Sequence, residues 1–188
     1  MPHEPSGRAA ASSPPVSLRE VVGKAIVVHT ATYFLVGLAA FVALDYSTWF
    51  ADPRVAAYMR QTDEPIVMAG PLFQPLRGAL FGLMCFVLRD SLFRRRSGWA
   101  ALWCTLLVAG ILSPFGPTPS SIEGMVYTTW PLAWHLRGLP EIVIQSGLLA
   151  WLLHAWVTGA LGRAVRVILG LVFAAAILLP VLGLVAGR

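Results

Sequence analysis

The residue in this sequence with the clearest capacity for chemistry is an arginine inside an apolar stretch. Arg77 lies within segment 70–93, whose residues before Arg89 are otherwise uncharged. A guanidinium at the centre of an apolar helix costs about 2.5–3.5 kcal/mol or more unless it is paired, hydrated or able to reach the membrane surface. Its planar fork of donors fits phosphate and carboxylate groups. Arg77 therefore indicates either an anion-binding site or an ion pair.

Four further ionisable residues are predicted to reach the depth of Arg77. They are Glu123, His135, Arg137 and Glu141, which stand in or beside the connection to a later apolar segment. We expect Arg77 and Glu141 to form a buried ion pair at the centre of this cluster. The cluster would bind an anionic headgroup, an isoprenoid phosphate or a small anion. The alternative is that the Arg77–Glu141 pair only fastens two helices together.

Two histidines and two cysteines form a second candidate group. His29, Cys85, Cys104 and His154 come out at similar depths in four apolar segments when residues are counted at about 1.5 Å each. Such ligands can hold a transition metal, and two histidines can hold a haem. However, none of these residues has a partner at the i, i+4 spacing of a metal-binding helix. We expect the thiols to fill space and the histidines to bond neighbouring helices, with no metal or cofactor.

The elements that must position these residues are long apolar segments. The sequence is 57% hydrophobic and only 12% charged, whereas a soluble domain is about a quarter charged. Charged residues gather between the apolar stretches, which is typical of repeated membrane spans. The net charge of +5 lies beside those stretches, so membrane orientation explains it better than binding to nucleic acid.

The sequence therefore predicts an all-α integral membrane protein, a bundle of about five transmembrane helices. The predicted spans are 25–44, 70–93, 98–112, 140–160 and 164–185. Residues 1–20 are predicted to form a disordered tail and residues 21–188 a single transmembrane domain, with no cleavable signal peptide.

Prolines and glycines refine these spans. Regular helix in the second span is expected from about Gln74, after a proline-interrupted start, and Pro140 is expected to open the fourth span. Gly78 and Gly82 form a small-xxx-small pair that permits close helix contact. The short link between the last two spans predicts that they pair antiparallel.

Two connections are long enough to carry structure of their own. Asp52 and Pro53 predict a short capped helix after the first span. Tyr127, Trp130 and Trp134, before the fourth span, suit the membrane interface. Either connection is expected to be a lid over a pocket or an anchored loop.

Basic residues predict the orientation, since cytoplasmic loops near span ends collect Lys and Arg. With the amino terminus in the cytoplasm, that side receives Arg8, Arg19, Lys24, Arg89, Arg94, Arg95, Arg96, Arg163 and Arg166. Most acidic residues then fall on the other side. The prediction is a cytoplasmic amino terminus, an outer carboxyl terminus and a bacterial inner membrane. Orientation accounts for the run 94–96, which would also attract anionic lipid headgroups.

Three functions are consistent with this pattern. The first is binding or transport of a small anionic or lipid-derived ligand through the outer polar cluster. The second is a non-catalytic subunit or assembly factor of a larger membrane complex, and the third is an intramembrane enzyme acting on a lipid. Membrane lipids are the expected partners, together with another membrane protein or a second copy of the chain.

Overall fold

Every element in the part of the chain that the structure describes is a helix. The computed structural model describes residues 16–112 and 116–186. Within them, four helices are long and apolar enough to cross a bilayer. These four are α1 (Leu18–Ala43), Gly70–Val87, α9 (Leu132–Val157) and α10 (Arg163–Ala186). The second of them comprises the 3-10 turn η1 (Gly70–Phe73) and α5 (Gln74–Val87).

Shorter helices complete the chain. An apolar helix, α7 (Gly98–Leu107), continues into the π-helical η2 (Val108–Leu112). The connecting helices are α2 (Tyr46–Ala51), α3 (Pro53–Ala56), α4 (Pro65–Met68), α6 (Arg89–Phe93) and α8 (Ile122–Tyr127).

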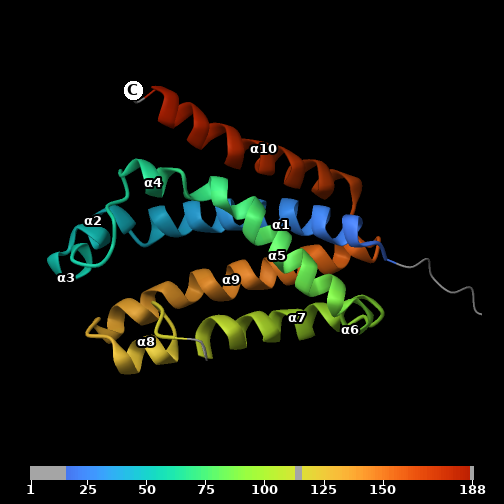
Figure 1. Ribbon diagram of the computed structural model, residues 1–188, viewed down its shortest axis with the longest axis horizontal. Coiled ribbons are helices and arrows are strands. Elements are labelled where there is room, and N and C mark those ends of the chain that lie inside the picture. The colour runs from blue at the N-terminus through green and yellow to red at the C-terminus, as the bar shows by residue number, and fades with distance from the viewer. Residues whose placement is uncertain (1–15, 113–115, 187–188) are drawn as a thin grey trace, which may run out of the picture.

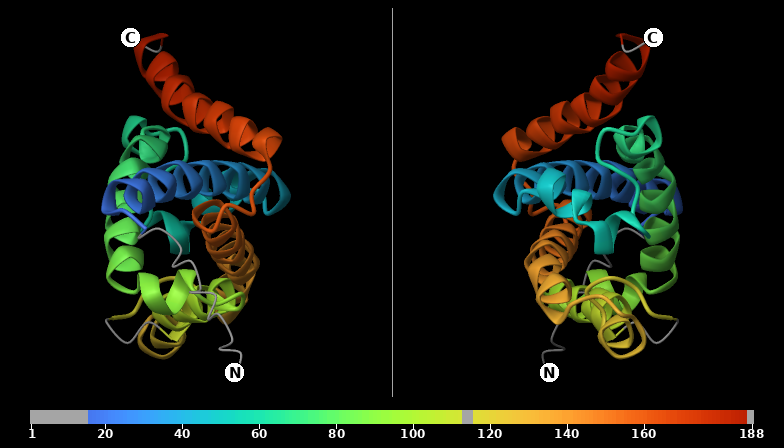
Figure 2. Two further views of the ribbon diagram at one scale, coloured as in Figure 1. Left: turned by 90° about the vertical axis from the view of Figure 1, so that its right-hand side faces the viewer. Right: turned by 90° about the vertical axis from the view of Figure 1, so that its left-hand side faces the viewer.

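The helix α1 lies at the centre of the molecule. It packs against α5, α9 and α10, and α7 packs on the far side of α9 (Figures 1 and 2). Helices α2, α3, α4 and α8 gather at one end of the bundle, which we call the α8 end. Helix α6 and the beginning of α1 lie at the opposite end, the α6 end (Figure 1).

Glycines allow α1 and α5 to approach closely, as their spacing predicts. A Cβ atom on Gly78 would lie 2.7 Å from the Cα of Ile26, and one on Gly82 would lie 2.7 Å from the Cα of Val22. Both distances are too short for real atoms, so these positions require glycine. The predicted contact is confirmed as the interface between α1 and α5.

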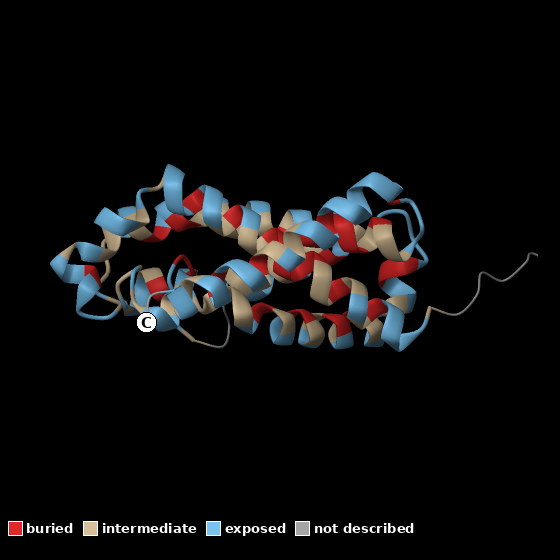
Figure 3. Cartoon of the chain, turned by 90° about the horizontal axis from the view of Figure 1, so that it is seen from above, coloured by how far each residue is buried: buried red, intermediate tan, exposed pale blue. Residues whose placement is uncertain are grey.

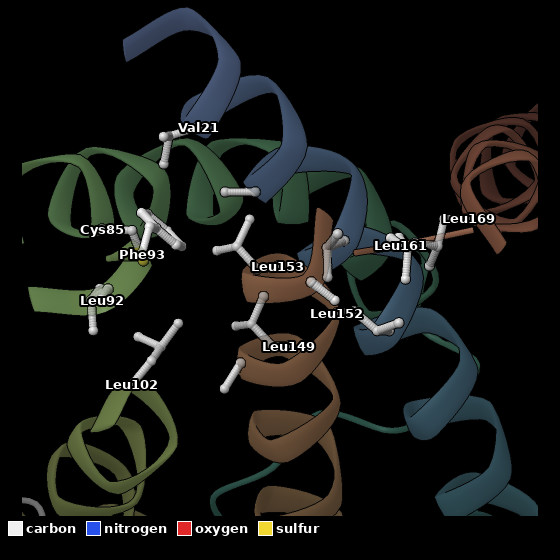
Figure 4. Packing of buried hydrophobic residues seen from close by; sticks show 14 of the residues in the cluster. Val21, Cys85, Leu92, Phe93, Leu102, Leu149, Leu152, Leu153, Leu161 and Leu169 are labelled. Atoms are coloured by element: carbon white, nitrogen blue, oxygen red, sulfur yellow. The ribbon is translucent and has the colours of Figure 1, made fainter. Parts of the chain in front are cut away.

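The apolar core occupies the half of the bundle nearer the α6 end. Its buried side chains come from α1, α5, α6, α7, α9 and the start of α10, and Leu102 and Leu153 are among the most completely buried (Figure 4). Along the outer faces of the long helices, most residues are exposed (Figure 3). On α10 these include Leu171 and Leu182. Apolar side chains on outer faces suit helices surrounded by lipid.

The first two predicted spans have different bounds in the structure. Helix α1 begins at Leu18, because the Ser17 hydroxyl caps it by accepting a hydrogen bond from the N–H of Glu20. The helix therefore includes the last residues of the predicted disordered tail, 1–20. Residues 1–15 of that tail lie outside the part of the chain that the structure describes. Regular helix in the second span does begin at Gln74, but it ends at Val87, where the charged residues begin.

The helix α9 begins before the proline that was expected to open it. Pro140 lies inside α9, which starts at Leu132. Residues before Pro140 pack against the preceding loop: His135 Nδ1 accepts a hydrogen bond from the N–H of Ser120 at 3.1 Å. A Cβ on Gly138 would lie only 2.4 Å from the Ser120 hydroxyl oxygen. These contacts keep the first turns helical although Pro140 cannot donate a backbone hydrogen bond.

The last two long helices do not form the predicted pair. Helix α9 ends at Val157, the following Gly159 has a φ of +79°, and the N–H of Leu161 donates back to the Ala155 carbonyl at 2.9 Å. Leu161 and Leu169 are then buried in the core. This turn directs α10 across α1, and Figure 2 shows α10 diverging from the other long helices.

The interface between α1 and α5 generates a stability prediction. In Gly82→Ala the added methyl group would force the two helices apart, and overpacking of this kind costs about 1–3 kcal/mol. We expect a lower midpoint of thermal unfolding in detergent. Gly23→Ala on α1 is the control, because nothing lies within 4 Å of a Cβ there. Equal stability of the two variants would contradict the close approach.

Candidate functional site

The centre of the candidate site is a histidine that joins three helices. His29 on α1 is 3% exposed, and its Nε2 lies 3.2 Å from Oε1 of Gln74 on α5. Its Nδ1 lies 3.4 Å from Nε2 of Gln145 on α9. The Gln74 side chain in turn donates to the Gly70 carbonyl at 3.2 Å. A neutral His29 that donates from Nε2 to Gln74 and accepts at Nδ1 from Gln145 has both ring nitrogens hydrogen-bonded; we call these residues the His29 network.

Three further polar residues lie one helical turn from the His29 network, on the same three helices. Tyr33 follows His29 on α1, Arg77 follows Gln74 on α5, and Glu141 precedes Gln145 on α9. Because α5 and α9 run antiparallel to α1, Tyr33 and Glu141 lie on the α8 side of the network, and we call these two residues the polar layer. Arg77 lies on the α6 side, next to Gly78, which packs against Ile26. Arg77 is within electrostatic range of both His29 and Tyr33.

The predicted ion pair between Arg77 and Glu141 does not form. The carboxylate of Glu141 instead accepts a hydrogen bond from the Tyr46 hydroxyl. Tyr46 reaches it because Asp45, with φ of +47°, turns the chain so that α2 follows directly after α1. Burial, and then the bond to Glu141, raise the pKa of Tyr46, so its hydroxyl stays protonated as a donor.

Arg77 itself has an exposed side chain. Within residues 16–112 and 116–186, it makes no hydrogen bond and no ion pair with another residue. This arrangement leaves the five N–H donors of the guanidinium open to an anion from outside the described chain.

Arg137 has a different role from the one predicted. Its guanidinium donates to the carbonyl of Leu44, the residue that ends α1, and lies 5.3 Å from the centre of the Trp49 ring. Cations at the carboxyl end of a helix satisfy its free carbonyls and its dipole. The indole N–H of Trp49 is buried and has no partner among the described residues. Arg137 thus fixes α9 to the end of α1.

His135 is also separate from the polar layer. It is 1% exposed, and its Nε2 lies 3.3 Å from the Thr128 hydroxyl while its Nδ1 accepts from Ser120. It holds the loop around α8 against α9. Glu123 lies half-buried in the first turn of α8, and no ion pair within the described residues joins it to the other predicted site residues.

Aromatic side chains surround the α8 end. The rings of Trp49 and Trp134 lie 6.2 Å apart, as do those of Trp130 and Trp134. Arg54 lies over the Trp134 ring, and its hydrogen bonds lower the pKa of Asp52. Asp52 also caps α3, as predicted. Ring contacts thus hold the two connections to each other at the α8 end.

The metal candidates do not come together as a group. Among the described residues no three His, Cys, Asp or Glu side chains are placed to hold a metal ion. His29 belongs to the His29 network, and His154 Nε2 bonds the carbonyl of Arg95 at 3.0 Å. Cys85 is buried in the core, whereas Cys104 is exposed.

Sequence reasoning missed the residues that complete the site. Gln74 and Gln145 are uncharged, and Tyr33 and Tyr46 resemble the many other aromatic residues of the chain. A signal was available in their spacing, because each of Tyr33, Gln74 and Gln145 lies one turn from His29, Arg77 or Glu141 on its own helix. An intramembrane glutamine also requires a polar partner.

No family model, curated protein or solved structure matches this chain. The fold and the site define its class directly. Across residues 16–112 and 116–186 it is an all-helical protein with four helices long and apolar enough to cross a membrane, and polar residues gather between three of them.

Proposed function

We propose that this chain is a multi-pass membrane protein that binds a small anionic or lipid-derived ligand through Arg77. The observation that carries the proposal is the exposed guanidinium of Arg77, which stands on an apolar helix and makes no hydrogen bond or ion pair with another described residue. An unpaired arginine on an apolar helix is costly, and an anion removes that cost. Phosphate and carboxylate are the groups that the arginine fork fits best.

The neighbours of Arg77 favour a ligand with a polar head and an apolar remainder. Tyr33 and His29 are the polar groups within electrostatic range of the guanidinium, whereas the exposed residues around Arg77 on α5 include Leu76 and Leu80. A polar head would lie against Arg77 while an apolar tail remained in lipid. This division matches an isoprenoid phosphate or a fatty acid.

Binding is supported more directly than transport. The His29 network, which lies on the α8 side of Arg77, is closed by its own hydrogen bonds, and the apolar core follows toward the α6 end. Passage of a ligand through the bundle would require both to open. We therefore propose a ligand that reaches Arg77 from the surrounding lipid.

We further propose five membrane crossings in a bacterial inner membrane, with the α6 end in the cytoplasm. Helix α7 and η2 together supply the fifth crossing, since they run beside α9 between the two ends (Figure 1). Most basic residues flank the long helices at the α6 end, in keeping with cytoplasmic loops. The amino terminus is then cytoplasmic and the carboxyl terminus outside.

This orientation predicts which cysteines a membrane-impermeant maleimide can label. In a chain with Cys85 and Cys104 replaced by alanine, Tyr58→Cys should react in intact spheroplasts. Arg95→Cys should react only after the membrane is opened. The side chains of Tyr58 and Arg95 are both exposed. Tyr58 follows α3 and Arg95 follows α6, and these two helices lie at opposite ends of the bundle (Figure 1). Labelling of both cysteines from the same side would refute the topology, and the reverse pattern would invert it.

If Arg77 binds the ligand as proposed, Arg77→Gln should weaken the binding of an anionic amphiphile. The probes are farnesyl phosphate and oleate, added to the purified chain and followed by native mass spectrometry. Loss of a charged hydrogen-bond partner should reduce affinity about tenfold or more. Arg77→Lys, which keeps charge but not the fork, should give an intermediate loss.

Two controls make this experiment decisive. Arg60→Gln removes an exposed arginine that pairs with Glu64, and it should leave binding unchanged. The exchange variant Arg77→Glu with Glu141→Arg tests simple fastening of two helices. If Arg77→Gln lost folded yield and the exchange restored it, Arg77 would be a structural residue and the proposed function would fail.

A further inference from the structure

A cavity at the α6 end is lined by basic and aromatic side chains. Its volume is about 440 Å³. One wall is formed by residues 94–96 and by Trp99 at the start of α7. The other wall is the last part of α9, including Trp151 and His154. Arg77 belongs to neither wall, so this cavity is distinct from the site proposed above.

The loop that carries the arginines is held in place from both sides. His154 on α9 donates from Nε2 to the Arg95 carbonyl at 3.0 Å. On the other side, a Cβ on Gly98 would lie 1.6 Å from the carbonyl oxygen of Leu92, so the turn closes tightly against α6. Phe93, next to the loop, is buried in the core. The arginines therefore extend from a fixed backbone.

Two of the three arginines are uncompensated within the described part of the chain. Arg94 pairs with Asp90 at 2.9 Å, and both side chains are exposed. The side chains of Arg95 and Arg96 make neither an ion pair nor a hydrogen bond with another described residue. Adjacent free guanidinium groups at the mouth of a cavity are complementary to a phosphate.

The aromatic residues favour a bilayer lipid over a soluble anion. Trp99 stacks on Trp103 with an interplanar angle of 20°, and Trp151 is 52% exposed on the facing helix. Exposed tryptophans at the end of a membrane helix lie at the level of the lipid headgroups. The cavity thus opens where a headgroup and the first part of its acyl chains would meet the protein.

We infer that this cavity binds the headgroup of an anionic membrane phospholipid. Arg95 and Arg96 contact the phosphate, and Trp99 and Trp151 lie against the glycerol and the upper acyl chains. His154 is a positioning residue, because it holds the arginine loop against α9. Basic pockets between membrane helices are suited to such lipids.

The test uses the full chain purified in detergent and titrated with phosphatidylglycerol or, separately, phosphatidylcholine, with bound lipid counted by native mass spectrometry. The double variant Arg95→Gln with Arg96→Gln should weaken the tightest phosphatidylglycerol site about tenfold or more. The matched control is Arg163→Gln with Arg166→Gln, which removes the same charge at the same end outside the cavity. Binding by this control should be unchanged.

A third variant, His154→Leu, should weaken binding without a change in charge, because it releases the loop from α9. If both double variants lost the same affinity for phosphatidylglycerol, the effect would be a general attraction between positive charge and anionic lipid, and the inference would be overturned. Equal binding of phosphatidylcholine would also overturn it. Displacement of the lipid by inorganic phosphate at similar affinity would assign the cavity to a soluble anion instead.

Discussion

The hydrogen bonds of His29 are the interaction on which the other features depend. An imidazole between membrane helices must find both a donor and an acceptor inside the protein, since lipid supplies neither. Gln145 and Gln74 meet that need from opposite sides of α1. Because Gln74 is the first residue of α5, the same bonds fix where α5 begins and therefore where Arg77 lies, one turn later.

The bundle is divided into two halves with different contents. Toward the α6 end, apolar side chains from α1, α5, α7 and α9 fill the interior (Figure 4). Toward the α8 end, the same helices carry the His29 network and the polar layer, and the two folded connections cover that end. The close glycine contacts between α1 and α5 lie in the apolar half, and Arg77 stands directly beside one of them, Gly78. Arg77 therefore lies where the polar and apolar halves meet.

Local sequence signals predicted much of the fold and less of the site. The long helices, the start of α5 at Gln74, the glycine contact and the Asp52 cap each depend on a few neighbouring residues. The partner of Glu141 could not be predicted, because Tyr46 reaches it only through the left-handed turn at Asp45. The start of α9 likewise depends on distant contacts. Charge drew attention to Arg77, while the neutral glutamines that position it carry no comparable signal.

The most direct test of the His29 network is a double-mutant cycle between α1 and α9. The free energy of unfolding would be measured for His29→Leu, for Gln145→Leu and for the two together, in the same bilayer or detergent. Each single variant should be destabilised, and the double variant should lose less than the sum, with a coupling of about 0.6–1.7 kcal/mol. Strictly additive losses would mean that His29 and Gln145 do not interact, and the network that joins α1, α5 and α9 would lose its basis.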